Sequence, residues 1–200
     1  MASLSRWLST IFKSKGSCPA AGSDPTNEDS GDGQSCWNGR RVLQAQRLRS
    51  WLNANAVGDV LIIGDLNAYG LEDPVFDLTS NGYIDQVAAF NSFGYSYVFD
   101  GNAGRLDHAI ASASMTAKIA GVQHWHVNAD EPSIIDYNLE FKQPACPACG
   151  PDYYTVTQYR SSDHDPIIIG LKLNDLDGDG LSDSIESYVR SMVGIDLIMR

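Results

Sequence analysis

The segment VLIIGDLN, residues 60–67, constrains the fold more than any other part of the chain. Its apolar residues follow one another without alternating with polar ones, which predicts a β-strand that is covered on both faces. Together with the segments around it, this strand indicates a layered α/β domain. The strand ends at Asp65, and Asn67 follows two residues later on the same side of the chain.

Helical and extended segments surround this strand. Residues 37–56 have apolar side chains at helical spacing, which predicts a surface helix with four arginines around its other side: Arg40, Arg41, Arg47 and Arg49. A short helix is expected in residues 71–83, closed by Asn81 and Gly82. Further strands are expected in residues 95–112 (two strands around a turn at Asp100), in VQHWHV (residues 122–127, where His124 and His126 would share a face in a structural role) and in residues 167–173.

The charge of the chain limits the kind of protein it can be. The formal net charge is −11 at pH 7, which disfavours binding of nucleic acid through a broad basic surface, because such binding depends on Lys and Arg neutralising phosphates. It leaves room for an enzyme that meets phosphate through a bound cation. No apolar run approaches the roughly 20 residues that cross a bilayer, and residues 1–16 lack the apolar core and cleavage site of a signal peptide.

The four cysteines form two pairs, Cys18 with Cys36 and Cys146 with Cys149. Both pairs lie in loops rich in Gly, Pro and Ser, which predicts two local disulfides and an oxidising compartment. A zinc site formed by all four cysteines is the alternative, although the chain contains only one C-x₂-C spacing.

Polar groups follow or precede apolar runs at three places: Asp65 and Asn67, Asp107, and Asp163 with His164. A half-buried acid costs free energy unless it is paired, hydrogen-bonded or bound to a metal. Each place has a simpler interpretation: Asp65 as a turn residue, Asp107 as a partner of Arg105, and Asp163 as part of a polar loop. One shared site at the strand ends explains all three together.

At these residues the chain closely resembles the endonuclease/exonuclease/phosphatase superfamily, with the deoxyribonuclease-I-like fold, and within it the secreted bacterial nucleases. The matching segments run from about residue 12 to 173 and are FKSKGS, CWNGRRV, GDLNAYGLEDP, YSYVFDG, LDHAIAS, HVNADEP, DYNLEFK and SSDHDPIIIGL. The resemblance implies a two-sheet α/β sandwich, metal-dependent phosphodiester hydrolysis with DNA favoured over RNA as substrate, and an extracellular or periplasmic location.

The resemblance also implies roles for single residues. Asp65 would activate the attacking water, and Asn67 would hydrogen-bond that water or the phosphoryl oxygen. Asp163 would bind Mg²⁺ or Mn²⁺, for which oxygen ligands are suited. His164 would contact the phosphate, with Asp107 orienting its ring.

The chain departs from the family pattern before FKSKGS. A strand with a metal-binding Asn, a strand with a metal-binding Glu, and an Asn-His pair are expected there, and Thr10 and Ile11 stand at the positions of the pair. Residues 1–11 match nothing in the family, so residues 12–173 are interpreted as the C-terminal portion of the domain. With few anionic ligands beside Asp163, weak metal binding and little nuclease activity are expected, and the missing portion as a separate chain is one expected partner.

The C-terminal residues 174–200 carry a calcium-loop pattern. In DLDGDGLSDSIE the predicted Ca²⁺ ligands are Asp175, Asp177, Asp179, Asp183 and Glu186, and Gly180 permits the sharp turn. A solvated acidic linker is the alternative. For the whole chain, the alternatives to a nuclease are an inactive Ca²⁺-binding extracellular module, and a phosphatase or phospholipid phosphodiesterase on the same fold.

Overall fold

The computed structural model of the protein describes residues 6–56, 58–90, 94–137 and 153–172. Its centre is a four-stranded sheet with the order β1-β2-β6-β3. The strand β2 pairs in parallel with β1 and antiparallel with β6, which also pairs with β3. The bounds of these strands are β1 (Arg6–Ser9), β2 (Val60–Asp65), β3 (Ile84–Asp85) and β6 (Asp107–Ala111).

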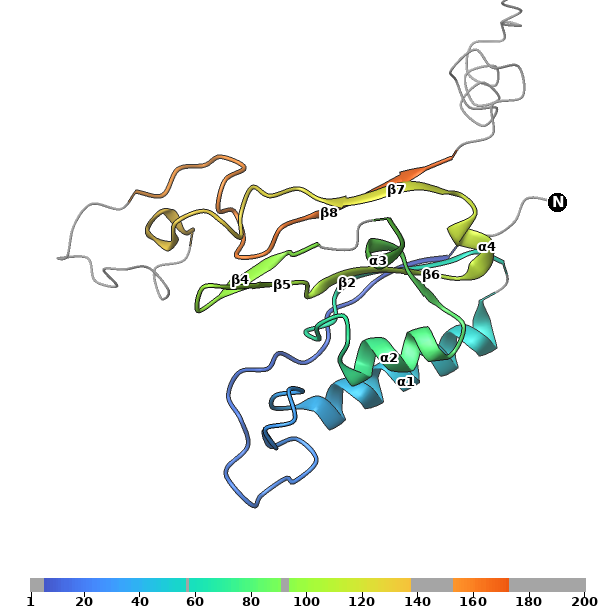
Figure 1. Ribbon diagram of the computed structural model, residues 1–200, viewed down its shortest axis with the longest axis horizontal. Coiled ribbons are helices and arrows are strands. Elements are labelled where there is room, and N and C mark those ends of the chain that lie inside the picture. Colours follow the sequence, from blue (N-terminus) through green and yellow to red (C-terminus); the bar gives the residue numbers. More distant parts are fainter. Residues whose placement is uncertain (1–5, 57, 91–93, 138–152, 173–200) are drawn as a thin grey trace, which may run out of the picture.

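Helices α1 (Asn38–Asn55) and α2 (Asp73–Ser80) lie side by side against one face of this sheet (Figure 1). Ile62 of β2 packs there in one core with Leu52 of α1 and Leu78 of α2. Both helices were predicted: α1 from the spacing of its apolar residues, and α2 as a short helix closed by Asn81 and Gly82, where it does end. The helical period places these side chains on the face that meets the sheet.

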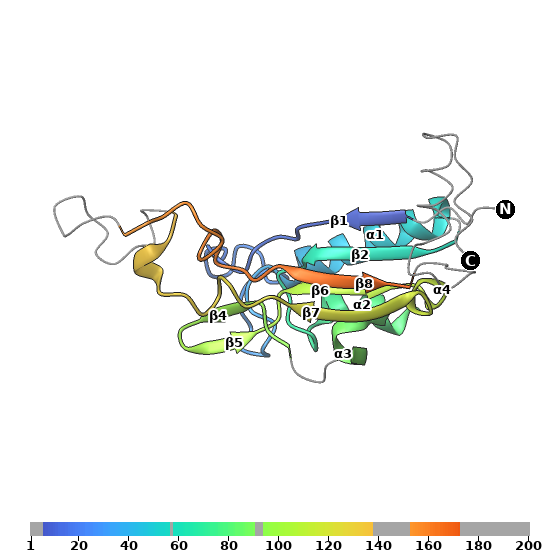
Figure 2. The same ribbon diagram turned by 90° about the horizontal axis from the view of Figure 1, so that it is seen from above.

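A second, antiparallel sheet of β7 (Ile119–His124) and β8 (Ile167–Leu171) covers the other face. Figure 2 shows β8 lying over β6, and the two strands are in contact. Leu61 of β2 packs in this second core with Ile119, while its neighbour Ile62 faces the helices. The predicted cover on both faces of this strand is therefore confirmed, and the architecture is a layered α/β fold.

Short elements complete the described chain. The hairpin of β4 (Tyr97–Phe99) and β5 (Asn102–Gly104) turns at Asp100, as predicted. The remaining helices are α3 (Gln86–Phe90), α4 (Ala113–Thr116) and the 3₁₀ helix η1 (Ser133–Ile135). Within the described ranges, no helix is long and apolar enough to cross a membrane.

Two predictions from the sequence were wrong. Arg41 is not on the solvent side of α1: it is fully buried and donates hydrogen bonds to the carbonyl oxygens of Cys36 and Gln34, at 2.7 and 2.8 Å. His124 and His126 do not share a strand face, because β7 ends at His124. The strand β1 was not predicted at all.

Cys18 and Cys36 form a disulfide with a Cα–Cα distance of 5.4 Å. This bond confirms one of the two predicted pairs and rules out a zinc site made of all four cysteines. Cys146 and Cys149 lie outside the described residues, as do the predicted calcium ligands of residues 175–186.

Candidate functional site

The site is assembled where β2 and β6 end. Asp65 lies directly opposite Asp107 in the antiparallel register of these strands. His164 comes from a distant segment: it forms a β-bridge with Tyr97, and its Nδ1 lies 2.6 Å from Oδ2 of Asp107. The structure thus brings Asp65, Asp107 and His164 together, whereas Arg105, the alternative partner of Asp107, forms its ion pair with Asp85.

Asp65 and Asn67 form a compact turn at the end of β2. Oδ1 of Asp65 accepts a hydrogen bond from the backbone N–H of Asn67, and Oδ2 accepts one from Nδ2 of Asn67, both at 2.6 Å. Nδ2 of Asn67 also donates to the carbonyl oxygen of Phe12, at 3.1 Å. Asp65 therefore does stabilise a turn, as its simpler interpretation predicted. A carboxylate has about four lone-pair positions, so these two bonds leave Asp65 able to accept a proton.

The surroundings change the acidity of both titratable groups. Burial raises the pKa of Asp65 to about 6, against the opposing hydrogen bond from Asn67 and charge of His164, while the charges of Asp107 and Asp163 add to the rise. Burial lowers the pKa of His164, but the hydrogen bond to Asp107 and the nearby carboxylates outweigh it, so the pKa is raised. Near neutral pH, Asp65 is therefore a base and His164 retains cationic character.

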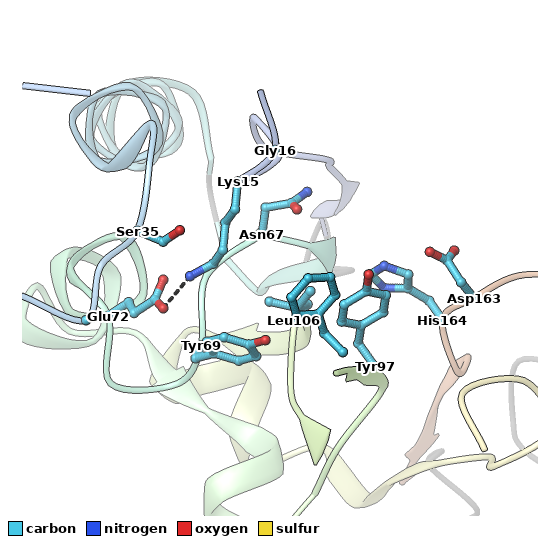
Figure 3. Close-up of a pocket in the computed structure, with 12 residues that line it drawn as sticks. Lys15, Gly16, Ser35, Asn67, Tyr69, Glu72, Tyr97, Leu106, Asp163 and His164 are labelled. Atoms are coloured by element: carbon cyan, nitrogen blue, oxygen red, sulfur yellow. Dashed lines mark hydrogen bonds and ion pairs between the residues drawn. The ribbon is translucent and has the colours of Figure 1, made fainter. Parts of the chain in front are cut away.

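A cavity of about 530 Å³ opens beside these residues (Figure 3). Asn67, Asp163 and His164 line it directly. Asp65 and Asp107 are not among its lining residues; they connect to it through their hydrogen bonds to Asn67 and His164. Because Asp107 holds Nδ1 of His164, the other ring nitrogen, Nε2, is the one available to a ligand.

The opposite wall of the cavity carries an ion pair that the sequence did not reveal. Lys15 donates a hydrogen bond to Glu72 and lies 4.6 Å from the ring centroid of Tyr69. Burial raises the pKa of Glu72 and lowers the pKa of Lys15. Both residues stand inside quoted motifs, FKSKGS and GDLNAYGLEDP, and their co-location needed the tertiary fold.

Asp165 is a second missed residue. Its side chain is fully buried, and its Oδ1 accepts backbone N–H groups from Val127, Asn128 and Ala129 at 3.1, 2.9 and 3.0 Å. Its Oδ2 lies 2.7 Å from Nδ1 of His126. Nδ2 of Asn128 in turn donates to the carbonyl oxygen of His164, at 2.7 Å. This network fixes the loop that carries Asp163 and His164.

Ser96 joins the two halves of the His164–Asp107 pair. Its buried Oγ accepts the backbone N–H groups of Leu106 and Asp107, at 3.1 and 3.0 Å. Its carbonyl oxygen accepts the N–H of Asp165, at 2.8 Å. One fully buried serine therefore sets the distance between the strand that bears Asp107 and the loop that bears His164.

Comparison with known proteins places the chain in a family. The model of the endonuclease/exonuclease/phosphatase family matches residues 19–164. The chain belongs to this family. Its members hydrolyse phosphate esters of nucleic acids or other phosphorylated molecules and generally use divalent metal ions. A comparison with curated protein sequences gave no match.

Solved structures of this family resemble the chain in part. A family protein from Leptotrichia buccalis is 14% identical, with a TM-score of 0.40, and the match covers 64% of this chain and 42% of that one. A 3′-5′ exonuclease from Neisseria meningitidis is 16% identical, with a TM-score of 0.40, and the match covers 66% and 52% of the two chains. A family protein from Bacteroides thetaiotaomicron is 19% identical, with a TM-score of 0.36 and coverage of 43% and 34%. The chain therefore spans at most about half of these proteins.

The described part of this family member does not form a complete metal site. Among these residues, no three or more His, Cys, Asp or Glu side chains converge as metal ligands. Asp107 is engaged by His164, Asp65 by Asn67, and Glu72 by Lys15. Among the described residues, Asp163 is the carboxylate of the cavity lining that has no recorded hydrogen bond or ion pair. Mg²⁺ held by this one carboxylate would need water and substrate oxygens for the rest of its six ligands, so the described residues alone would hold it weakly.

Proposed function

We propose that the chain hydrolyses phosphodiester bonds of nucleic acids, with DNA as the favoured substrate, at the site of Asp65, Asn67, Asp107 and His164. The observation that carries the proposal is the 2.6 Å contact between His164 and Asp107, with Asp65 opposite Asp107 in the sheet. An imidazole held by a carboxylate, beside a carboxyl group of raised pKa, is an arrangement suited to acid–base chemistry.

In this proposal Asp65 removes a proton from the attacking water. Nδ2 of Asn67 is already occupied by Asp65 and Phe12, so the side-chain carbonyl oxygen of Asn67 is the atom available to the substrate complex. An oxygen acceptor can orient water but repels a phosphoryl oxygen. We therefore assign Asn67 to the water rather than to the phosphate.

His164 binds the phosphate in its protonated form. Asp107 accepts the hydrogen bond from Nδ1 and holds the ring, so Nε2 donates to a phosphoryl oxygen. The raised pKa of His164 favours this protonated form near neutral pH. Ser96 and Asp165 act on the pair only by positioning it.

The Mg²⁺ or Mn²⁺ ion proposed from the sequence would neutralise charge on the phosphate in such enzymes. Asp163 is its proposed ligand in this chain. Because the described residues leave that site incomplete, we expect slow turnover by the chain, and we route no step through a metal.

The test is a nicking assay with supercoiled plasmid, in which a single cut per molecule is visible. Slow conversion of the supercoiled to the relaxed form is expected in the presence of Mg²⁺ or Mn²⁺. The His164→Ala variant should lose this activity, because it removes the donor to the phosphate. Absence of any cutting of the plasmid and of circular single-stranded DNA by the wild-type chain, or equal cutting by the variant, would contradict the proposal. Parallel assays with p-nitrophenyl phosphate and a phospholipid test the alternative substrates.

The decrease of activity at acidic pH should follow the protonation of Asp65. The base is active as a carboxylate, and its pKa is raised to about 6. Activity should therefore rise about tenfold per pH unit up to about pH 6 and then reach a plateau, which ends at higher pH where His164 loses its proton. For an ordinary aspartate the rise would end near pH 4. Initial rates between pH 4.5 and 8 measure this limb, and a flat profile down to pH 4.5 would exclude Asp65 as the base.

The extracellular or periplasmic location and the Ca²⁺ loop belong to the same proposal. The Cys18–Cys36 disulfide supports an oxidising compartment. The predicted Ca²⁺ ligands lie outside the described residues, so that part rests on the sequence pattern.

A further inference from the structure

A second cavity adjoins the one beside His164. It has a volume of about 310 Å³ and is lined by Arg160 and Tyr137, among others. The two cavities share three lining residues, Tyr97, Phe99 and Asp163. The two cavities therefore adjoin at β4, and together they are called the groove here.

Aromatic rings lead from the catalytic site into this groove. The ring of Tyr97 lies 4.7 Å from that of His164, and the ring of Phe99 lies 6.4 Å from that of Tyr97, at an interplanar angle of 12°. Tyr97 and Phe99 alternate along β4, so they lie on the same face of the hairpin. Phe99 is the outermost ring and is 65% exposed.

The groove has no positive field, because Asp163 lines both cavities and the basic side chains are paired with carboxylates. Each cavity has one basic side chain with a carboxylate partner: Lys15 pairs with Glu72 in the first, and Arg160 lies 3.6 Å from Asp136 in the second. His164 lies between these two pairs and supplies the donor to a phosphate oxygen, so binding of the remaining nucleotides would depend on stacking more than on charge. The aromatic rings supply the second element of single-strand recognition, because unpaired bases expose faces on which a ring can stack.

From these observations we infer that the groove holds an unpaired stretch of nucleic acid with nucleotides on both sides of the cleaved bond, and that Phe99 is the stacking platform for a base next to the cleaved phosphate. The inference rests on the proposed function and narrows its substrate to single-stranded DNA or RNA cleaved internally. A small phosphomonoester would leave the second cavity and the ring of Phe99 unused.

The binding test uses the Phe99→Ala variant in an Asp65→Ala background, so that no substrate is consumed. Fluorescence anisotropy with a labelled oligothymidylate should show about tenfold weaker binding, as expected for the loss of one stacked base. Phe76→Ala is the matched control: Phe76 is also 65% exposed but lies on α2, outside the groove. Unchanged binding by Phe99→Ala, or an equal loss in the control, overturns the inference.

The cleavage test uses substrates of different structure. Circular single-stranded DNA should be cut, because it offers nucleotides on both sides of every bond. In the Phe99→Ala variant the loss of kcat/KM for this substrate should exceed the loss for bis(p-nitrophenyl) phosphate, which has no base, by about tenfold. Processing of linear ends only, or equal losses on both substrates, overturns the inference, whereas no hydrolysis of any substrate by the wild-type chain contradicts the proposed function itself. In that case the binding test still decides on the role of Phe99.

Discussion

Replacement of Asp65 with alanine is expected to reduce phosphodiester hydrolysis at least about a hundredfold, the contribution typical of a positioned general base. The variant loses the proton acceptor, and the side chain of Asn67 loses one of its two hydrogen-bond acceptors and keeps the other, the carbonyl oxygen of Phe12. Initial rates of plasmid nicking measure the effect. Far-ultraviolet circular dichroism and thermal unfolding should show that the fold survives, because Asp65 lies at the end of β2, outside both apolar cores.

Asp29→Ala is the matched control for this experiment. Asp29 makes the same kind of local turn, since its Oδ1 accepts the backbone N–H of Gly31 at 2.9 Å, but it is exposed and lies outside the site. Its replacement should leave the rate within about twofold of the wild type, as is usual for surface substitutions. If Asp65→Ala behaved in the same way, Asp65 would be a turn residue and nothing more.

The largest effect on stability is expected for Asp165→Ala, with a loss of about 3 kcal/mol or more in the free energy of unfolding. The substitution leaves the backbone N–H groups of Val127, Asn128 and Ala129 buried without the acceptor that serves all three. Urea unfolding followed by tryptophan fluorescence measures the loss. A value below about 1 kcal/mol, the size of one ordinary hydrogen bond, would show that water replaces the carboxylate.

Two controls sharpen this prediction. Asp163→Ala removes a carboxylate from the same loop, but from a side chain that lines the cavity. Within the described ranges this side chain has no recorded hydrogen bond, so the loss in the free energy of unfolding should be small. The second control is pH. Burial opposes ionisation of Asp165, but the backbone N–H groups and His126 outweigh it, so its pKa is lowered. The stability that this carboxylate contributes should therefore be present above about pH 4, the unfolded value, and fade as the pH falls below it. The difference between wild type and Asp165→Ala should shrink accordingly.

Some features of this protein follow from local sequence. The non-alternating apolar residues of β2 predicted a strand covered on both faces, and the packing of Leu61 and Ile62 into opposite cores confirms it. The spacing of apolar residues predicted α1, and the end signal at Asn81 and Gly82 predicted α2. The motifs GDLN and SDHDP indicated the family, and they contain Asp65 and His164, which the fold brings together beside the cavity. These signals work because side-chain periodicity and short turns depend on residues that are close in the sequence.

Other features were decided by the tertiary structure alone. The helical spacing that placed Arg41 in solvent could not show that a disulfide-closed loop would offer it the carbonyl oxygens of Cys36 and Gln34. In the sequence Asp165 is indistinguishable from any aspartate in a polar loop. The structure shows that three backbone N–H groups, from residues 127–129, donate to its carboxylate. The pairing of Lys15 with Glu72 joins residues 57 positions apart. Burial and partners of polar groups depend on such long-range contacts, so sequence determined the layers and the reactive residue types, and the fold determined which charges are held, paired and exposed to substrate.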